Sequence, residues 1–401
     1  PAMTQLPSFP FQPGPRSEPP AEYQRLRGQQ ELPRVRLNNG SQALVATRYD
    51  HVTQVLTDRR FSRSAATGGT LFARSSESLP LITTDAPVHS DRRAALAHAF
   101  TGRSVRAMRP MVAKLADQQL TELAAGPTPA DLVEGFAVPF TVRVICRVLG
   151  LPSSDIHLFK PWVDQMMSVG RFPQKQVDEC HQRFHGYVAG LVDTARAAID
   201  RGEAVPGLLG DLLAPRNPRR RLSRDDVVVL SAGLLIAGYE TTSNVLATVV
   251  FHLLRRPELM AQVREGPARA DDVLEELLRF MCANGTGGMP HVATADVPLA
   301  GGVVVPEGET VVPVPDAANR DPAVFDEPAR VRTDRRPNPH VAFGHGPHYC
   351  LGAELARLEL RVGVSALVSR FPALRIAVGD DELRWRTDMF VRGLWRLPVT
   401  W

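Results

Sequence analysis

The segment FGHGPHYCLG, residues 343–352, places one cysteine among glycines and histidines, directly before an Ala/Leu/Arg-rich run that predicts a helix. Backbone N–H groups in a tight Gly-rich loop and at a helix N-terminus stabilise negative charge, so they favour the ionised form of Cys350. Gly346 and Gly352 let the backbone approach a flat ligand, and Phe343 would shield the sulfur from water. The loop therefore predicts a thiolate presented to a metal ion. The alternative is a small, buried, apolar thiol, which is the ordinary fate of a free cysteine.

A long apolar helix is predicted from residue 223 to about residue 256, with Asp225 and Asp226 in its first turn, where carboxylates suit the helix dipole. Its middle reads AGYETT, so Glu240 and Thr241 lie where a core helix normally avoids polar groups. The charge at Glu240 also argues against a membrane span. An acid beside an alcohol could move a proton. The structural alternative is a glycine-kinked helix whose threonines bond to their own carbonyls.

Two charged pairs recur at helical spacing. Glu276 and Arg279 in EELLRF lie three residues apart, and His89 and Arg93 lie four apart, so each pair shares one helix face. Taken alone, such pairs are ordinary surface contacts worth roughly a few tenths of a kcal/mol. The arginines at 219–221 are expected in a solvated loop.

The composition is that of a large soluble enzyme. The 401 residues carry a formal net charge of +4, and this charge is spread along the chain, which does not favour nucleic-acid binding. Cys146, Cys180 and Cys282 show no CxxC spacing, so they predict core thiols in a reducing cytoplasm and not a zinc site. The Pro-rich start lacks the basic region and apolar core of a signal peptide or anchor, so no membrane attachment is expected.

The remaining patterns predict a mainly α protein with a small β-rich part. A strand near 43–47 and a helix over 49–57 precede a region of helical periodicity from about residue 90 to 279. Short alternating runs over 292–314 predict strands, and a final helix is expected over 352–370.

The pattern Phe-x-x-Gly-x-x-x-Cys-x-Gly, the acid–alcohol pair and the Glu-x-x-Arg pair occur in an order that resembles the cytochrome P-450 family, and ANRDP at 318–322 strengthens the match. The resemblance covers about residues 34–401. It implies a single cytochrome P-450 catalytic domain over 34–401 after an N-terminal extension, 1–33. It also implies the P-450 fold, with haem b between the long distal helix and the helix after Cys350.

The resemblance assigns roles residue by residue. Cys350 would be the axial iron ligand, Thr241 would hydrogen-bond dioxygen, and Glu240, where many relatives have Asp, would relay protons. Glu276, Arg279 and Arg330 would hold the cysteine loop from behind. His291, where relatives usually have Arg, would contribute a neutral hydrogen bond to a haem propionate. The other cofactor-binding residues would be His89, Arg93, His348, Phe343, Gly344, Gly352, Ala237 and Gly238.

The implied function is a haem-thiolate monooxygenase of the soluble, bacterial, actinomycete-like type, which uses dioxygen to oxidise a natural product. Electrons from NAD(P)H would arrive through a separate ferredoxin and ferredoxin reductase, because the chain shows no GxGxxG after a strand. Exposed arginines at 103, 106, 109, 357 and 361 would attract the acidic ferredoxin, or would simply be solvated surface. A peroxide-driven peroxygenase and a non-catalytic haem sensor or carrier remain alternatives, as does oxidative coupling in place of oxygen insertion.

The substrate pocket is expected to mix apolar and polar side chains, which suits a mid-sized natural product such as a macrolide or other polyketide, or a cyclic dipeptide. A cytoplasmic monomer is expected. The residues predicted to line the pocket are Leu79, Leu81, Ile82, Leu234, Asn284, Thr286, Met289, Phe390 and Val391.

Overall fold

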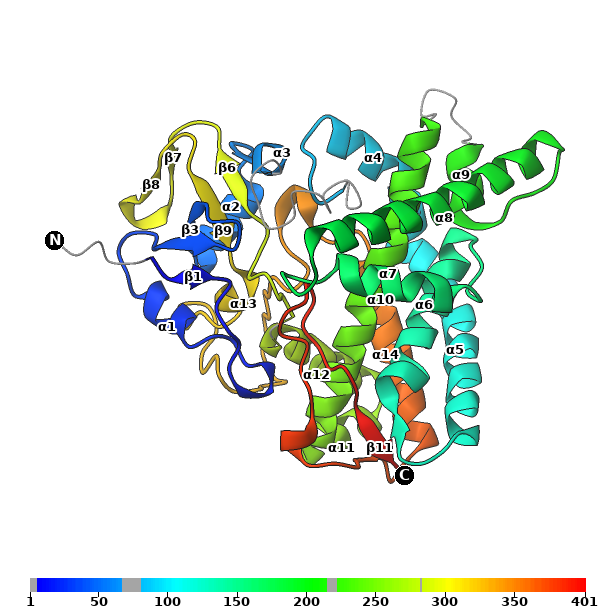
Figure 1. The fold of residues 1–401 in the computed structure, drawn as a ribbon. Coiled ribbons are helices and arrows are strands. Elements are labelled where there is room, and N and C mark those ends of the chain that lie inside the picture. The colour runs from blue at the N-terminus through cyan, green and yellow to red at the C-terminus, as the bar shows by residue number, and fades with distance from the viewer. Residues whose placement is uncertain (1–5, 67–80, 215–221, 282) are drawn as a thin grey trace.

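The computed structural model describes residues 6–66, 81–214, 222–281 and 283–401. A β-rich part lies on one side and a larger helical part on the other, as Figure 1 shows. The helices are α1 (Glu22–Arg27), α2 (Tyr49–Thr57), α3 (Arg63–Ala66), α4 (Val88–Leu96), α5 (Gly102–Ala125), α6 (Val138–Leu149), α7 (Ile156–Met166), α8 (Gln174–Asp200), α9 (Gly207–Leu213), α10 (Arg224–Leu254), α11 (Pro257–Glu265), α12 (Pro267–Phe280), α13 (Pro315–Ala318) and α14 (Ala353–Arg370).

The β-rich part is built on a six-stranded sheet with the order β1-β2-β3-β9-β6-β4 and on the small sheet β7-β8, whereas the small sheet β10-β11-β5 belongs to the helical part (Figure 1). The strands are β1 (Ser8–Phe9), β2 (Arg34–Leu37), β3 (Gln42–Ala46), β4 (Phe61–Ser62), β5 (Ala130–Asp131), β6 (His291–Ala293), β7 (Val297–Pro298), β8 (Val304–Val305), β9 (Thr310–Pro313), β10 (Arg375–Ile376) and β11 (Pro398–Thr400).

The expectation of a mainly α chain with a small β-rich part is confirmed, and α2 has the expected bounds. Residues 6–33, part of the expected N-terminal extension, pack on the six-stranded sheet. Strand β1 pairs in parallel with β2, and Phe9, Phe11 and Tyr23 share a buried cluster with β2, β3 and β9. Phe9 also packs on the loop at 284–289: a Cβ built on Gly287 would lie 2.3 Å from Phe9 Cζ.

Helix α10 runs through the middle of the helical part (Figure 1) and packs against α6, α8, α12 and α14. Ser223 caps it by accepting a hydrogen bond from the Asp226 N–H, and Arg92 on α4 pairs with the Asp226 carboxylate at 2.7 Å. Among the described residues it is the one helix that is long and apolar enough to cross a membrane. Most of it is buried inside the protein, which identifies it as a core helix.

Candidate active site

The cysteine loop is a constrained turn that delivers Cys350 to the start of α14. The Cys350 N–H donates to the Phe343 carbonyl at 2.8 Å across a 3-10 turn, Gly346–His348. Gly346 has a φ of 68°, and a Cβ there would lie 2.6 Å from the Leu56 carbonyl oxygen at the end of α2. A side chain at 346 would therefore strain the turn and push it away from α2.

Several forces act on the Cys350 thiol. Cys350 is exposed in this chain, yet desolvation by the surrounding protein raises the pKa of its thiol, whereas a hydrogen bond from the Gly352 N–H and the charges of Arg93 and Arg357 lower it. A coordinated metal ion deprotonates a thiol outright, so this residue suits a ligand better than a free thiolate. Cys146 and Cys180 are buried core thiols as expected, and Cys282 lies outside the described residues.

Phe343 lies beside the loop, where the Arg357 guanidinium carbon is 4.5 Å from the centre of its ring. Arg357 also donates to the Glu275 carboxylate and to the Tyr349 hydroxyl. A Cβ on Gly352 would meet nothing within 4 Å, so the chain leaves room on that face of the loop. Gly344 has a φ of 74°, which explains the glycine there without a ligand.

His89, Arg93 and His348, which we call the cation cluster, are brought together from α4 and the cysteine loop. The His89 and His348 rings lie 4.1 Å apart, and His348 Nδ1 contacts the Leu81 carbonyl at 3.1 Å. Burial and the nearby Arg93 charge lower the pKa of His89. Its Nε2 is buried without a hydrogen-bond partner in the described part of the chain. An unpaired buried nitrogen is costly, so this cluster is suited to receive an anion.

His291 opens β6 beside this cluster and is buried. Its Nδ1 contacts the Met289 carbonyl at 2.9 Å, and its Nε2 accepts the Arg63 Nε–H at 3.0 Å. Both ring nitrogens are therefore occupied by protein, and no N–H remains for another acceptor. The expected direct hydrogen bond from His291 to a propionate does not fit this geometry.

On α10, the Thr241 hydroxyl donates to the Ala237 carbonyl at 2.7 Å, the local bond that the structural alternative predicted. Its oxygen can still accept a hydrogen bond. The glycine at position 238, expected as a cofactor contact, is explained by packing: a Cβ there would lie 2.4 Å from Ile145 Cγ1 on α6. Gly238 therefore allows α6 and α10 to approach closely, and its missing side chain points at α6.

Glu240 is buried and ion-paired. Its Oε1 accepts from Arg386 Nη2 at 2.6 Å, and Arg386 Nη1 donates to Asn244 Oδ1. Arg386 Nη2 also lies 3.7 Å from Asp164 of α7, which pairs with Lys160 at 2.7 Å. Burial raises the pKa of Glu240, and the Arg386 charge opposes that rise.

The line of charges continues outward from Lys160, which pairs with Glu134 at 3.3 Å. More than half of the Glu134 side chain is exposed. Ionisable groups therefore lead from Glu240 in the core to the surface. No pattern in the sequence links position 386 to position 240, so Arg386 could not have been identified from it.

The Glu276–Arg279 pair is fully buried and not a surface contact, with Arg279 Nη2 donating to Glu276 Oε1 at 2.7 Å. Its third member is Arg335, whose Nε reaches Glu276 Oε1 at 3.1 Å. The prediction of Arg330 is wrong: its side chain is 70% exposed and pairs with Glu327. Arg330 contributes only its backbone carbonyl, which accepts from Arg279. The path of the loop that carries both arginines turns Arg335 toward the core, and the spacing of residues in the sequence could not show this.

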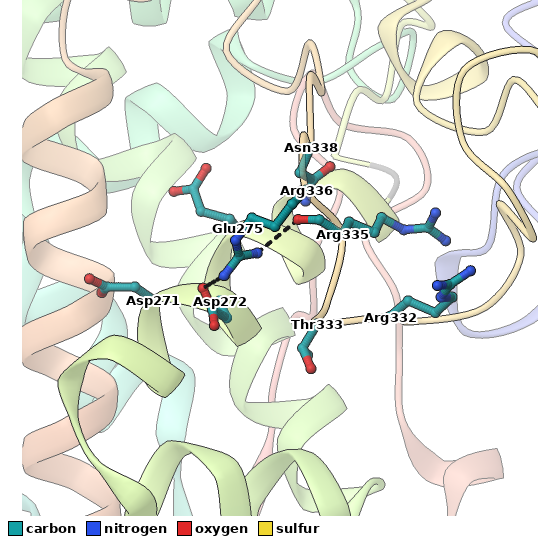
Figure 2. A pocket seen from close by; sticks show the side chains of 8 residues that line it. All are labelled: Asp271, Asp272, Glu275, Arg332, Thr333, Arg335, Arg336 and Asn338. Carbon is teal, nitrogen blue, oxygen red and sulfur yellow. Dashed lines mark hydrogen bonds and ion pairs between the residues drawn. The ribbon is translucent and has the colours of Figure 1, made fainter.

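A surface cleft of ≈ 250 Å³ lies on the outer side of this network (Figure 2). Its acids are paired with arginines: Asp272 with Arg336, and Asp271 with Arg361. Glu275 pairs with Arg357 at 2.6 Å. The cleft thus supports the cysteine loop and α14 structurally and presents no unpaired carboxylate.

The residues predicted to contact substrate comprise two polar side chains, one residue outside the described ranges and six apolar side chains. The Asn284 amide donates to Asp316 Oδ1, and the Thr286 hydroxyl donates to the Gly288 carbonyl, so both polar groups are used within the protein. Val391 is held beside Asn284 by an isolated β-bridge. Leu79 lies outside the described residues. The side chains that remain candidates are apolar: Leu81, Ile82, Leu234, Met289, Phe390 and Val391.

Comparisons with known proteins agree with this arrangement. The cytochrome P-450 family model matches residues 141–392. The chain is 36% identical over 385 residues to mycinamicin IV hydroxylase/epoxidase of Micromonospora griseorubida, with 94% of each chain covered. It is 38% identical over 383 residues to nocardicin C N-oxygenase of Nocardia uniformis subsp. tsuyamanensis, again with 94% of each covered.

Among solved structures, HinD with NMFT and NO is similar to this chain, with a TM-score of 0.91, 38% identity and 99% of each chain covered. The similarity therefore extends over nearly the whole fold. The chain belongs to the cytochrome P-450 family and is a monooxygenase that uses haem b, dioxygen and electrons derived from NAD(P)H.

Proposed function

We propose that Cys350 is the axial ligand of the haem iron and that the enzyme oxidises a mid-sized natural product. The observation that carries this assignment is the convergence of the cysteine loop and the cation cluster at the start of α14. Haem b presents an iron that accepts a thiolate and two propionates that need cations or N–H donors, and this chain offers both kinds of group side by side. The unpaired His89 Nε2 fits the second requirement.

The residues on the proximal side would hold the cofactor. Cys350 would bind the iron, and the space beside Gly352 would admit the flat ring. His89, Arg93 and His348 would bind the propionates. Glu276, Arg279 and Arg335 lock the segment behind the loop through buried, charge-assisted hydrogen bonds, which fixes the position of the sulfur.

The residues on the distal side would manage protons. When bound, the haem supplies the activation of dioxygen. Thr241 would position a proton beside the reacting oxygen through its hydroxyl. Glu240 would pass protons inward from the line of charges that begins at the exposed Glu134. A raised pKa suits this role, because such a carboxyl group binds a proton more readily near neutral pH.

The assignment of Cys350 is tested by Cys350→Ser in the purified enzyme. The reduced carbon monoxide complex of the wild type is expected to show the red-shifted Soret band that thiolate donation produces, and the variant is expected to lose it. Cys180→Ser is the matched control, because it removes a buried thiol on α8. An unchanged band in folded Cys350→Ser would reject the proposed ligand.

Electron delivery would use a ferredoxin and a ferredoxin reductase. Arg103, Arg106 and Arg109 at the start of α5 are exposed and form no ion pair with any residue in the described ranges. Arg361, in contrast, is paired with Asp271. We therefore assign the attraction of an acidic partner to α5.

This assignment is tested by the rate of reduction by ferredoxin as ionic strength increases. Arg106→Glu should slow reduction and weaken its salt dependence, because exposed charges steer association. Arg361→Glu provides the comparison on α14 and should have the smaller effect. A rate that is indifferent to salt and to Arg106→Glu would place the docking surface elsewhere.

The substrate class follows from the apolar lining and from the relatives, whose names include a mycinamicin hydroxylase/epoxidase and a nocardicin N-oxygenase. We propose a macrolide or a cyclic dipeptide as the substrate, and a soluble, cytoplasmic, monomeric enzyme. Difference spectra recorded with both compound classes would show binding by displacement of water from the iron. Turnover with an electron donor and without peroxide would distinguish a monooxygenase from a peroxygenase or a haem carrier.

A further inference from the structure

Position 63 lies directly opposite position 291 across a strand pair. Strands β4 and β6 are antiparallel, with Phe61 opposite Ala293 and Ser62 opposite Val292. The next residue in this register, Arg63, therefore faces His291. The ladder explains why Arg63 Nε reaches His291 Nε2 at 3.0 Å.

The hydrogen bonds of His291 fix its role. Its Nδ1 contacts a carbonyl oxygen and must carry the proton, so Nε2 is the acceptor that receives the Arg63 Nε–H. The ring is buried and neutral. It can hold the arginine in place but has no donor left for a carboxylate.

Arg63 joins the cation cluster in the buried region between β6 and the cysteine loop. Its side chain is largely buried, and Nη1 donates to the Ile82 carbonyl at 3.2 Å. His348 Nδ1 contacts the carbonyl of Leu81, the residue before Ile82, so Arg63 and His348 bind neighbouring carbonyl groups of one segment. The guanidinium adds a permanent positive charge beside the cation cluster, and its planar fork suits a bidentate contact with a carboxylate.

Within the described ranges, Asp85 is an acidic side chain whose charge acts on the Arg63 guanidinium. Its carboxylate accepts hydrogen bonds from the Ser62 hydroxyl at 2.5 Å and from the N–H groups of Arg63 and Ser64 at 3.1 Å. Asp85 thus organises the start of α3, while the arginine side chain extends toward His291.

We infer that Arg63 supplies a haem propionate with the cation that relatives carry at position 291, and that His291 is the residue that positions it. In this chain the cation lies on Arg63, directly across the β4–β6 ladder from His291. This inference rests on the haem site proposed above. The carbon monoxide spectrum of the wild type tests that site independently.

The test measures propionate contacts directly in the ferric holoenzyme. Arg63→Leu and Arg63→Gln should shift the propionate-bending band of the resonance Raman spectrum. They should also speed haem transfer to a scavenging apoprotein by about 10- to 100-fold, the factor expected for losing one charge-assisted hydrogen bond. Arg59→Leu removes an exposed arginine four residues earlier and should change neither quantity.

The double variant Arg63→Leu/His291→Arg tests the exchange itself. The propionate-bending band and the rate of haem loss should return toward the wild-type values, because the new arginine at position 291, on β6, replaces the cation lost at position 63. An unshifted band in folded Arg63→Leu and Arg63→Gln would overturn the inference, and so would a double variant that loses haem as fast as Arg63→Leu.

Discussion

Replacing Arg386 by Met should destabilise the protein in a manner that depends on pH. The change removes the cation that lies 2.6 Å from Glu240 in the core and keeps an apolar stem of similar length. At an effective dielectric constant of about 20, unit charges roughly 4 Å apart attract by about 4 kcal/mol. Removing one member of a buried pair ordinarily costs about 3–5 kcal/mol. We therefore expect the free energy of unfolding to fall by about 3–5 kcal/mol at about pH 8.

The sign of the pH dependence follows from the pKa of Glu240. Burial already raises it above the ordinary carboxyl value, and loss of the opposing Arg386 charge raises it further. The folded variant then keeps its proton to a higher pH than the unfolded chain does. Stability therefore falls as pH rises between those two pKa values, by about 1.4 kcal/mol for each added unit of difference.

The assay is urea unfolding of wild type and variant at about pH 5.5 and about pH 8, followed by circular dichroism. Destabilisation by Arg386→Met should be smaller at the lower pH, where Glu240 is closer to neutral. Glu240→Gln in the Arg386→Met background should recover part of the loss, because no unpaired carboxylate remains. Arg384→Met, at an exposed position, is the control. Equal destabilisation at both pH values would refute the reasoning.

Three further outcomes are expected. Thr241→Ala should leave iron reduction intact but divert oxygen consumption to hydrogen peroxide, as measured against product formed, and unchanged coupling would assign the proton to another donor. Arg279→Ala should lower the free energy of unfolding by about 3–5 kcal/mol and reduce haem content, whereas Arg330→Ala should change both little, because only the Arg330 backbone joins the network. Gly238→Ala should destabilise by about 1–3 kcal/mol, and Ile145→Ala in the same chain should relieve the clash; a lack of relief would show that the contact with α6 is not the cause.

The sequence predicted local structure well, because short-range patterns determine it. The bounds of α2, the capped start of α10 and the run of α14 follow from periodicity and terminal residues. Buried ion pairs were harder to predict from the sequence, since their members come from segments that are far apart in the chain. Arg386 lies 146 residues from Glu240, and the choice of Arg335 over Arg330 depends on the path of a loop.

Arg63, the cation beside β6, could not be assigned to the site by comparing motifs alone. The resemblance to the family implied an arginine at position 291, where this chain has histidine, but the sequence did not indicate that we would propose Arg63 in its place. The answer required the strand register, which pairs Ser62 with Val292 and so places Arg63 opposite His291. Registers between residues 228 positions apart are set by tertiary folding and leave no short-range pattern in the sequence.

The packing of Phe9 and Phe11 against the loop at 284–289 and against Arg392 has a practical consequence for protein engineering. The ring of Phe9 fills the space that a side chain at Gly287 would need, and the Phe11 carbonyl accepts from Arg392 at 3.4 Å. The first segment predicted to line the pocket, 283–289, therefore lies against Phe9, and the second, 389–391, directly precedes the residue that contacts Phe11. Shortening the proline-rich start to improve expression would remove this packing from the segments that we propose as the wall of the pocket, so we expect selectivity among substrates to change although no predicted pocket residue had been altered.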